Sequence, residues 1–438
     1  MIILENKKEL GLKMHQWAHM LFPICRSILG PGVRETLSLL QHQIPDLEVR
    51  KVKTGTQVFD WTIPKEWHVK EAYIADLDGN KVVDFDNNNL HLVGYSTAVN
   101  LTISRDNLLP HLYSLPNLPN AIPYVTSYYK ERWGFCVSEQ QRKEFVKNEY
   151  KVVIDSEFVD GELNYGELLI KGESDKEVLI STYICHPSMA NNELSGPVVT
   201  TALAQLINDL KNRYYSYRVV FVPETIGSIS FIHANIKKLK EHVVAGFVLT
   251  CIGDERAYSY LSSRSENTLS DRVAKHVLFY HTQDNYKSYS FLDRGSDERQ
   301  YCAPGVDLPI CSIMRTKYGE YPEYHTSLDD LNLVTPDGLV GGLEVAYKSI
   351  LLLEHNKYYK VSVYCEPQLG KRGLYPTLSK MDEDYTDVRT LLNFIAYCDG
   401  KRDLISIAEK IGVDALSLIP TIQRLLNEGL LLKDNKEF

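Results

Sequence analysis

The stretch VLISTYICHPSMANNELSG, residues 178–196, begins with an apolar, β-branched run that predicts a buried parallel strand over Val178–Ile184. Pro187 stops that strand and turns the chain, because proline has no backbone N–H to give to a sheet. A polar loop follows, and the apolar spacing then predicts a helix over Leu194–Leu210. His186 and a carboxylate in the loop therefore lie just beyond the carboxyl end of a strand, where open α/β sheets bind ligands.

Composition limits the class of protein. The chain has 438 residues, enough for two or three domains, and its 44% hydrophobic and 24% charged residues are typical of a globular protein in water. A net charge of −9 and a pI near 5.8 argue against nucleic acid as the main partner. No apolar run is long enough for a membrane span. Charges in the first ten residues argue against a signal peptide, so we expect a cytoplasmic protein.

The eight cysteines are scattered without a CxxC pair, which favours buried, reduced thiols over a disulfide framework. Cys185 lies next to His186, so a functional thiol is an alternative to a core cysteine at this one position.

Three regions differ in texture along the chain. Strands alternating with helices predict an α/β domain with a mostly parallel mixed sheet and helices on both faces, formed by residues 1–54 and 151–370. Between these segments, turn-rich sequence with short alternating runs predicts a small β-rich inserted domain over residues 55–150. We expect this domain to form a separate lobe that covers one edge of the site.

Residues 381–438 predict a winged-helix-like domain, because two short helices are followed by a longer helix and a short strand. The functional interpretation of such a module is DNA binding. This stretch, however, has seven Lys and Arg against eleven Asp and Glu, a net charge of about −4. An acidic module binds phosphates poorly, so we favour protein contact or homo-oligomer formation through it.

Residues whose side chains can bind a metal through nitrogen or oxygen lie at the predicted strand ends: His186, Glu193, Glu224, Asp254 and His325. Metal-dependent hydrolysis needs nitrogen or oxygen ligands on rigid elements, and a nearby carboxylate that takes a proton from water. Each residue alone could be a satisfied polar residue in a turn, but five at successive strand ends favour a metal site. The HExxH, GxSxG and GxxxxGK[ST] motifs are absent, which removes the helix-borne zinc, serine-hydrolase and P-loop signals.

The motifs at these positions resemble the di-zinc aminopeptidase superfamily: H-loop-N-N-E-L-S-G, P-E-T-x-G, I-G-D, G-S-D-E-R and Y-H-T-S-x-D-D. More closely, the chain resembles a bacterial family of aminopeptidase-like proteins that is often carried among surface-polysaccharide genes. Members of that family have an inserted small domain with a segment like residues 126–136, TSYYKERWGFC, and a C-terminal winged helix. The resemblance extends over essentially the whole chain.

The resemblance also shows where this chain departs from the di-zinc pattern. Asn192, followed by Glu193, stands where the superfamily has its bridging Asp followed by Asn. In Glu224-Thr225 the general-base position is kept, but Thr225 replaces a zinc ligand, and the later Asp ligand falls on Thr250. A bridging role needs a carboxylate, which these neutral side chains do not provide.

The resemblance therefore implies one zinc ion, held by His186 and His325 together with Glu193 or Asn192. It implies Glu224 as the general base. Expected substrate contacts, for which structural roles are equal alternatives, are Asp254, Arg299 and Tyr324.

The function that follows is a metal-dependent, aminopeptidase-like hydrolase of an amide in a peptide or in an amino-acyl or acyl-amino sugar derivative. One alternative is a binding protein that has kept the fold and lost the chemistry, which predicts purified protein without metal. Another is a transcription factor with a sensor domain, which the acidic C-terminal module disfavours.

Overall fold

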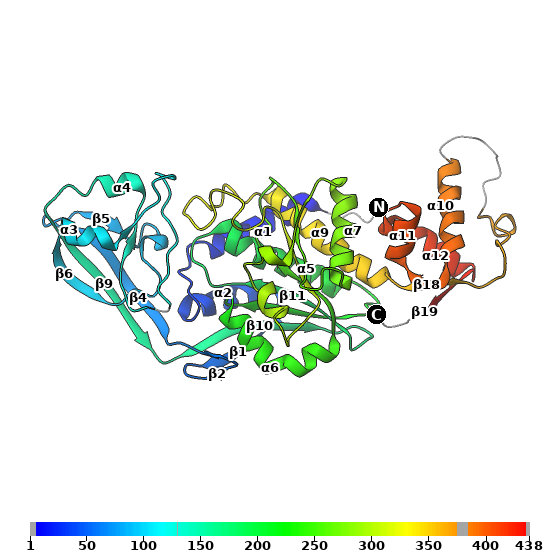
Figure 1. Ribbon diagram of the computed structural model, residues 1–438, viewed down its shortest axis with the longest axis horizontal. Coiled ribbons are helices and arrows are strands. Elements are labelled where there is room, and N and C mark those ends of the chain that lie inside the picture. The colour runs from blue at the N-terminus through cyan, green and yellow to red at the C-terminus, as the bar shows by residue number, and fades with distance from the viewer. Residues whose placement is uncertain (1–5, 129, 375–383, 435–438) are drawn as a thin grey trace.

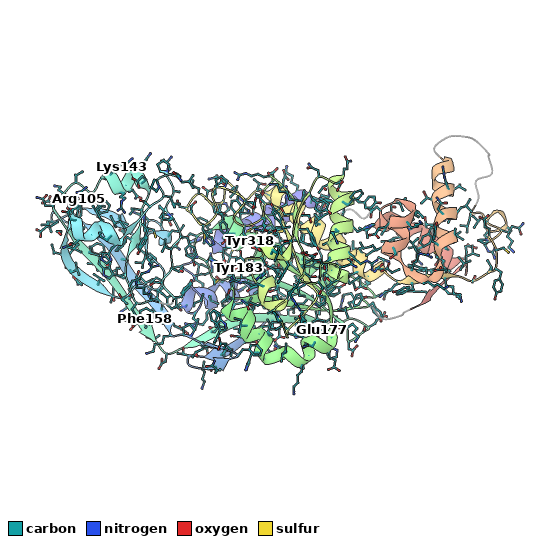
Figure 2. All side chains as sticks on the ribbon, viewed as in Figure 1. Arg105, Lys143, Phe158, Glu177, Tyr183 and Tyr318 are labelled. Carbon is teal, nitrogen blue, oxygen red and sulfur yellow. The ribbon has the colours of Figure 1, made fainter. Side chains whose placement is uncertain are left out.

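The computed structural model describes residues 6–128, 130–374 and 384–434, and its parts lie in a row (Figure 1). A central α/β body lies between a β-rich lobe and a small C-terminal module. In Figure 2, Tyr183 and Tyr318 lie in the central body, whereas Arg105 and Lys143 lie in the lobe. Residues 1–5, 381–383 and 435–438, which belong to the expected domains, lie outside the described residues.

The central body is built on an eight-stranded sheet with the order β1-β10-β12-β11-β13-β16-β14-β15. Strand β11, from the stretch that decides the fold, lies parallel to both of its neighbours, and all seven of its residues are buried. Burial on both faces explains why this strand is a continuous apolar run rather than an alternating one. The strand bounds, in sheet order, are β1 (Glu48–Lys53), β10 (Glu162–Ile170), β12 (Ser216–Val222), β11 (Glu177–Tyr183), β13 (Val243–Leu249), β16 (Ile310–Met314), β14 (Ser259–Leu261) and β15 (Lys287–Tyr289).

Helices cover both faces of this sheet, so the predicted fold class is confirmed. The larger hydrophobic core lies under α1 (Lys7–Leu21), α2 (Pro31–Gln43), α5 (Ser195–Asp209), α7 (Leu269–Thr282) and α9 (Pro336–His355). The opposite face packs against α6 (Ile226–His242) and α8 (Glu298–Tyr301).

Two predicted helix boundaries had different outcomes. The sequence predicts a first helix over Leu10–Leu29, but α1 ends at Leu21, because Pro23 has no N–H with which to continue the helical hydrogen bonds. Thr335 followed by Pro336 predicts a helix start at Pro336, and this is confirmed, since Thr335 Oγ1 accepts a hydrogen bond from Gly338 N–H at 2.9 Å and Pro336 is the first helical residue of α9.

The lobe has a four-stranded antiparallel sheet of its own, with the order β5-β4-β9-β6. No described strand between residues 55 and 150 joins the central sheet. Strand β9, however, continues to Val159 in the lobe sheet, where β4 and β6 pair with its two edges, although the sequence assigned residues from 151 onward to the α/β domain. Apolar alternation marks a strand but not its partners, so the domain limits remain a prediction. Lobe elements are β2 (Gln57–Val58), β3 (Trp61–Thr62), β4 (Glu66–Ala75), β5 (Lys81–Asp84), β6 (Val99–Ser104), α3 (Arg105–Leu108), β7 (Leu112–Tyr113), β8 (Phe135–Cys136), α4 (Glu139–Lys143) and β9 (Glu149–Val159).

A buried carboxylate ties the lobe to the central body. Glu66, at the start of β4, accepts hydrogen bonds from both terminal nitrogens of Arg34 in α2, at 2.7 and 3.0 Å. The Glu162 N–H of β10 donates to the same carboxylate at 2.8 Å. This contact joins β4 to two elements of the body.

The C-terminal module has the predicted winged-helix elements. Its sheet has the order β18-β17-β19, and β17 lies before the expected start of the module. Asp403 connects it to the body, because Arg272 of α7 donates to its two oxygens at 2.6 and 2.8 Å. Among the described residues, no helix has the length and apolar character needed to cross a membrane. Module elements are β17 (Tyr358–Val361), α10 (Asp384–Tyr397), β18 (Asp399–Asp403), α11 (Leu404–Ile411), α12 (Ile419–Asn427) and β19 (Leu431–Asp434).

Candidate active site

His186 and Glu224 emerge at the same edge of the central sheet. Strands β11 and β12 end at Tyr183 and Val222, which lie opposite one another in parallel register. The pairing extends one step further, since Ile184 N–H donates to Val222 O at 2.9 Å. The two side chains that follow these strands are therefore placed together by the sheet, as the sequence predicted.

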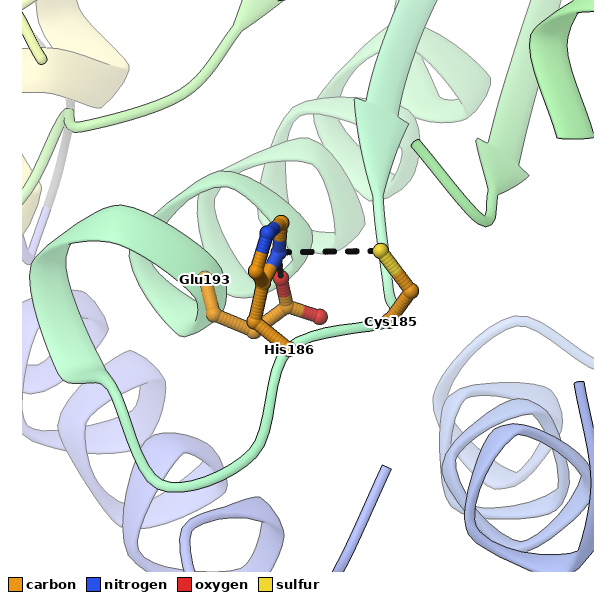
Figure 3. A group of neighbouring side chains, drawn as sticks. All are labelled: Cys185, His186 and Glu193. Carbon is orange, nitrogen blue, oxygen red and sulfur yellow. Dashed lines mark hydrogen bonds and ion pairs between the residues drawn. The ribbon is translucent and has the colours of Figure 1, made fainter. Parts of the chain in front are cut away.

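The His186 ring lies between two carboxylates. Its Nδ1 lies 2.8 Å from Glu193 Oε2 and 3.6 Å from Cys185 Sγ (Figure 3). Its Nε2 lies 3.6 Å from Glu224 Oε2. Glu193 therefore fixes the orientation of the ring, and the opposite nitrogen is directed toward Glu224. Donor atoms of Cys185, His186 and Glu193 all lie within 4.8 Å of one another, a spacing that could hold a metal ion.

Burial shifts the acidity of this cluster. It raises the pKa of Cys185 to about 11, so the thiol is protonated and unreactive at neutral pH. Burial also raises the pKa of Glu224, although His186 opposes that shift. For His186 itself, burial lowers the pKa, but its polar neighbours, the Glu193 carboxylate among them, outweigh that effect and raise the pKa well above its ordinary value.

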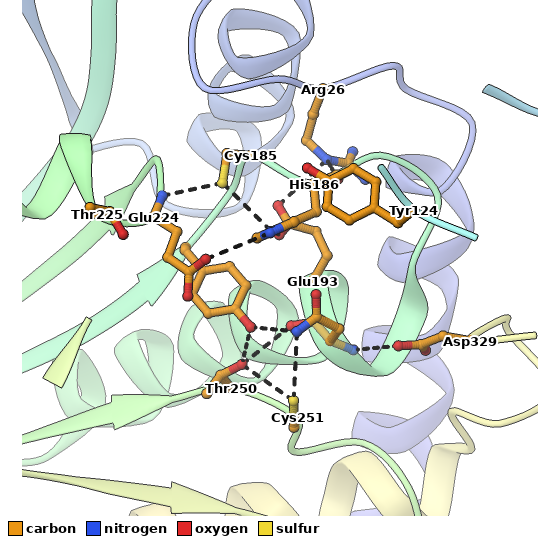
Figure 4. A network of polar contacts seen from close by, with 12 residues as sticks. Arg26, Tyr124, Cys185, His186, Glu193, Glu224, Thr225, Thr250, Cys251 and Asp329 are labelled. Carbon is orange, nitrogen blue, oxygen red and sulfur yellow. Dashed lines mark hydrogen bonds and ion pairs between the residues drawn. The ribbon is translucent and has the colours of Figure 1, made fainter. Parts of the chain in front are cut away.

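Arg26, from the segment between α1 and α2, supports the cluster and was not predicted. Its side chain is buried, and Nε donates to His186 O at 2.8 Å and lies 3.6 Å from Glu193 Oε1 (Figure 4). A second nitrogen donates to Leu21 O at 2.7 Å. Arg26 thus provides the counter-charge for a carboxylate that has no exposed surface. The only sequence signal is an arginine in an otherwise apolar stretch, FPICRSILG.

Glu224 is held by its backbone at a tight turn. Its N–H donates to Cys185 Sγ at 3.2 Å, and Thr225 follows with a φ of 66°, in the region that L-residues avoid. The Thr225 N–H donates to Asp297 Oδ1 at 2.8 Å, which stabilises this turn at the start of α6. The Glu224 side chain stays 20% exposed, so it can reach a ligand.

A neutral network occupies the positions where the resembled superfamily carries carboxylates. Asn192 Nδ2 donates to Tyr183 OH at 2.8 Å, and Thr250 Oγ1 donates to the same hydroxyl at 2.6 Å. Both side chains are buried. Asn192 Oδ1 is also buried, and it has no hydrogen-bond partner in the described part of the chain.

His325 lies near His186 but in a different setting. The two ring centres are 5.6 Å apart, and Tyr324 stacks on His325 at 3.9 Å. His325 does not belong to the group formed by Cys185, His186 and Glu193. Burial and the neighbouring His186 lower its pKa to about 3, so the ring is neutral.

The lobe contributes a residue that the sequence did not single out. Tyr124 places its ring edge against both imidazoles, with centres 5.2 Å from His186 and 5.2 Å from His325. Its N–H donates to His325 O at 2.8 Å. A segment of the lobe therefore lies against both histidines, and Figure 4 shows the Tyr124 ring beside His186.

Asp329 is a second residue without an individual prediction, although it lies in the Y-H-T-S-x-D-D motif. Its carboxylate accepts the backbone N–H groups of Asn191 and Asn192 at 2.5 and 3.0 Å. It thereby holds the first turn of the π-helical segment Ala190–Leu194, from which Glu193 projects. Burial raises the pKa of Asp329 to about 7.

Asp254 has a structural role rather than the expected substrate contact. Its carboxylate is 1% exposed and accepts hydrogen bonds from Asn191 Nδ2 at 3.0 Å and from Thr316 Oγ1 at 2.6 Å. The backbone N–H groups of Arg256 and Thr316 donate to it as well. These four bonds use the carboxylate to connect the loops after β13 and β16.

A cavity of about 340 Å³ opens beside His186 and Glu224. Arg299 also lines it, together with apolar side chains that include Trp61 and Tyr128. This volume lies at the small end of the range for ligand pockets, so the cavity suits a small molecule or one end of a larger one.

The family assignment follows from comparison with known proteins. A family model described as a domain of unknown function, DUF4910, matches residues 15–356, most of the chain. The chain belongs to this family. A winged helix-turn-helix model matches residues 356–433, a range that begins two residues before β17.

Relatives support the same assignment. A protein of Clostridium acetobutylicum, named for polysaccharide biosynthesis and an aminopeptidase-like domain, is 42% identical over 412 residues, 94% of each chain. A crystal structure described as a candidate peptidase from that organism has a TM-score of 0.92 at 41% identity, and covers 98% of each chain. The predicted aminopeptidase-like family with its winged helix is therefore confirmed.

A more distant neighbour shows the fold alone. A zinc aminopeptidase from Bacillus subtilis has a TM-score of 0.59 at 12% identity, and the match covers 81% of this chain and 96% of that one.

The residues present include donors that fit a zinc ion. Two imidazoles that share a tetrahedral zinc, with Zn–N bonds of about 2.0–2.1 Å, have ring centres roughly 5 Å apart, close to the 5.6 Å between His186 and His325. The unpartnered Asn192 Oδ1 is a further oxygen donor. A second ion lacks carboxylates, because Thr225 and Thr250 are neutral.

Proposed function

We propose that the protein is a zinc-dependent, aminopeptidase-like hydrolase that cleaves an amide of a peptide or of an amino-acyl or acyl-amino sugar derivative. The observation that supports this most directly is the His186 ring, oriented by Glu193 on one side and directed at Glu224, 3.6 Å away, on the other. Both residues line a cavity at the carboxyl ends of parallel strands. That combination provides a ligand, a base and space for a substrate.

In this proposal His186 and His325 hold one zinc ion, with Asn192 Oδ1 as a further donor. When bound, the ion polarises the amide carbonyl and lowers the pKa of water. Glu193, predicted as an alternative ligand, instead accepts the Nδ1 proton of His186, so Nε2 is the ring nitrogen that would bind a metal once its own proton is released.

Glu224 acts as the general base. It takes a proton from the attacking water and gives it to the departing amine. Burial raises its pKa, which makes the carboxylate a stronger base than one in water. The resembled superfamily has a carboxylate at the position of Thr225. Because Thr225 is neutral, Glu224 is the one acidic side chain of this turn.

The alternative is a binding protein that has kept the fold. Its support is the neutral network of Asn192, Tyr183 and Thr250, because these side chains replace charged ligands with mutual hydrogen bonds. It predicts a protein that neither retains zinc nor cleaves amides.

The test of the proposed base is Glu224→Gln, assayed on a panel of peptides and acyl-amino sugars. We expect turnover to fall by about 10²–10⁴ while the bound zinc stays constant. Glu241→Gln, an exposed carboxylate near the end of α6, is the matched control and should retain full activity. Unchanged turnover in Glu224→Gln contradicts the proposal, and an inactive wild type across the panel supports the binding protein.

A further inference from the structure

Arg299 is a cation without a counter-ion in the cavity wall. Its Nη2 donates to Thr225 Oγ1 at 2.5 Å, and its Nε is buried without a hydrogen-bond partner among the described residues. Among the residues that the structure describes, no carboxylate oxygen lies within 4.0 Å of the Arg299 guanidinium. An arginine has five N–H donors, so most of its hydrogen-bonding capacity is unused.

The nearby acids form no ion pair with Arg299. Glu224 lines the same cavity beyond ion-pair distance, and the charge of Arg299 opposes the rise in the pKa of that carboxyl. Asp297 Oδ2 has no hydrogen-bond partner among the described residues, but the other contacts of Asp297 and Glu298 are local. Asp297 Oδ1 accepts from Thr225 N–H and from Ser228 Oγ, both at 2.8 Å. Glu298 Oε1 accepts from the Gly295 and Ser296 N–H groups, both at 2.9 Å, and from Tyr318 OH at 2.9 Å. These contacts fix the segment that carries Arg299 without neutralising its charge.

A half-buried guanidinium in a cavity is stabilised by an anion, and a carboxylate matches its planar donors in pairs. The position of this charge places it near the proposed base, because Arg299 donates a hydrogen bond to Thr225, the residue next to Glu224. An anion at Arg299 therefore lies close to the bond on which Glu224 would act.

We propose that Arg299 binds a carboxylate of the substrate, so that the amide is followed closely by a free carboxylate, as in an N-acylated amino acid. The small volume of the cavity limits the ligand to about this size, and Trp61 and Tyr128 provide apolar walls for its side chain. The assignment of the carboxylate to a substrate rests on the proposed function, whereas the anion site itself does not.

The test measures binding without chemistry on the full-length protein. The probes are 3-phenylpropionate and the neutral 3-phenylpropan-1-ol, which contain no amide and so cannot be hydrolysed. Calorimetry at low salt should give a dissociation constant at least about tenfold lower for the carboxylate, as for a charge-assisted hydrogen-bonded pair. Arg299→Gln should remove this preference, and Arg299→Lys should retain part of it. Arg294→Gln, an exposed arginine of the same segment that does not line the cavity, is the matched control.

Equal affinity of the wild type for both probes, or no binding of either, overturns the inference. So does an unchanged preference in Arg299→Gln, once circular dichroism has shown that the variant is folded. If Arg299→Gln does not fold, Arg299→Met is compared in its place, and an unchanged preference in that uncharged variant overturns the inference as well. A carboxylate preference in a protein that cleaves no amide leaves the anion site in place and rejects the proposed function. Fast cleavage of neutral amides, at a rate that Arg299→Gln does not change, supports the proposed function and rejects the carboxylate site at Arg299.

Discussion

Glu193 orients the His186 ring and neutralises the charge of Arg26. It is fully buried, it orients His186, and it lies 3.6 Å from Arg26, which is 1% exposed. Glu193→Gln keeps the size of the side chain but removes its charge. Arg26 then remains in the interior without a carboxylate, and water cannot replace the lost partner.

The magnitude follows from that separation. Two unit charges 3.6 Å apart interact by ~4–5 kcal/mol at an effective dielectric constant of about 20. Removing one partner of a buried pair costs about 3–5 kcal/mol in the free energy of unfolding, since an uncompensated charge remains. We therefore expect Glu193→Gln to destabilise the central body by that amount.

A second substitution tests the cause. In Glu193→Gln/Arg26→Met both charges are gone and an apolar chain fills the space, so at least half of the lost stability should return. Urea unfolding of the wild type, the single variant and the double variant gives the comparison, with the exposed Glu241→Gln as control. A loss below about 1 kcal/mol in the single variant, or no recovery in the double variant, would refute the argument.

Two further ion pairs give predictions about the lobe and the C-terminal module. Burial alone raises the pKa of Glu66, but Arg34 outweighs it and the pKa falls from 4.5 to about 2. The pair therefore stabilises the fold fully above pH 4.5, and this stabilisation is lost as the pH falls from 4.5 to 2. Glu66→Gln should lower the free energy of unfolding by about 1–3 kcal/mol at pH 7 and make stability less dependent on pH in that window. An acid-unfolding curve unchanged from the wild type would contradict this. Asp403→Asn should loosen the module, because Arg272 loses its counter-charge and one of its two acceptor oxygens on that side chain. Limited proteolysis should then cut between α9 and α11 faster than in the wild type, and equal cleavage rates would exclude this role.

The sequence contained the part of the site that local pattern determines. His186 and Glu224 each follow a buried strand, and the strand-end rule of parallel sheets is enough to place them together. The apolar, β-branched run over Val178–Ile184 predicted β11 to within one residue, and the Thr335-Pro336 pair predicted the start of α9.

The remainder depends on contacts between distant segments, which no local pattern encodes. Arg26 reaches Glu193 from a region 167 positions earlier, and Tyr124 reaches His325 from the lobe. For Asp254 the sequence left a substrate contact and a structural role open, and the structure surrounds its carboxylate with four donors from three segments. A polar residue after a strand can thus serve a site or a loop, and only the partners distinguish the two.

The most direct test of the account is the zinc content of purified protein, measured by elemental analysis after dialysis against limiting zinc. The account predicts one ion per chain in the wild type and in Glu224→Gln, and almost none in His186→Ala or His325→Ala. Full occupancy in both histidine variants, or no zinc in the wild type, would contradict a single ion shared by these two histidines.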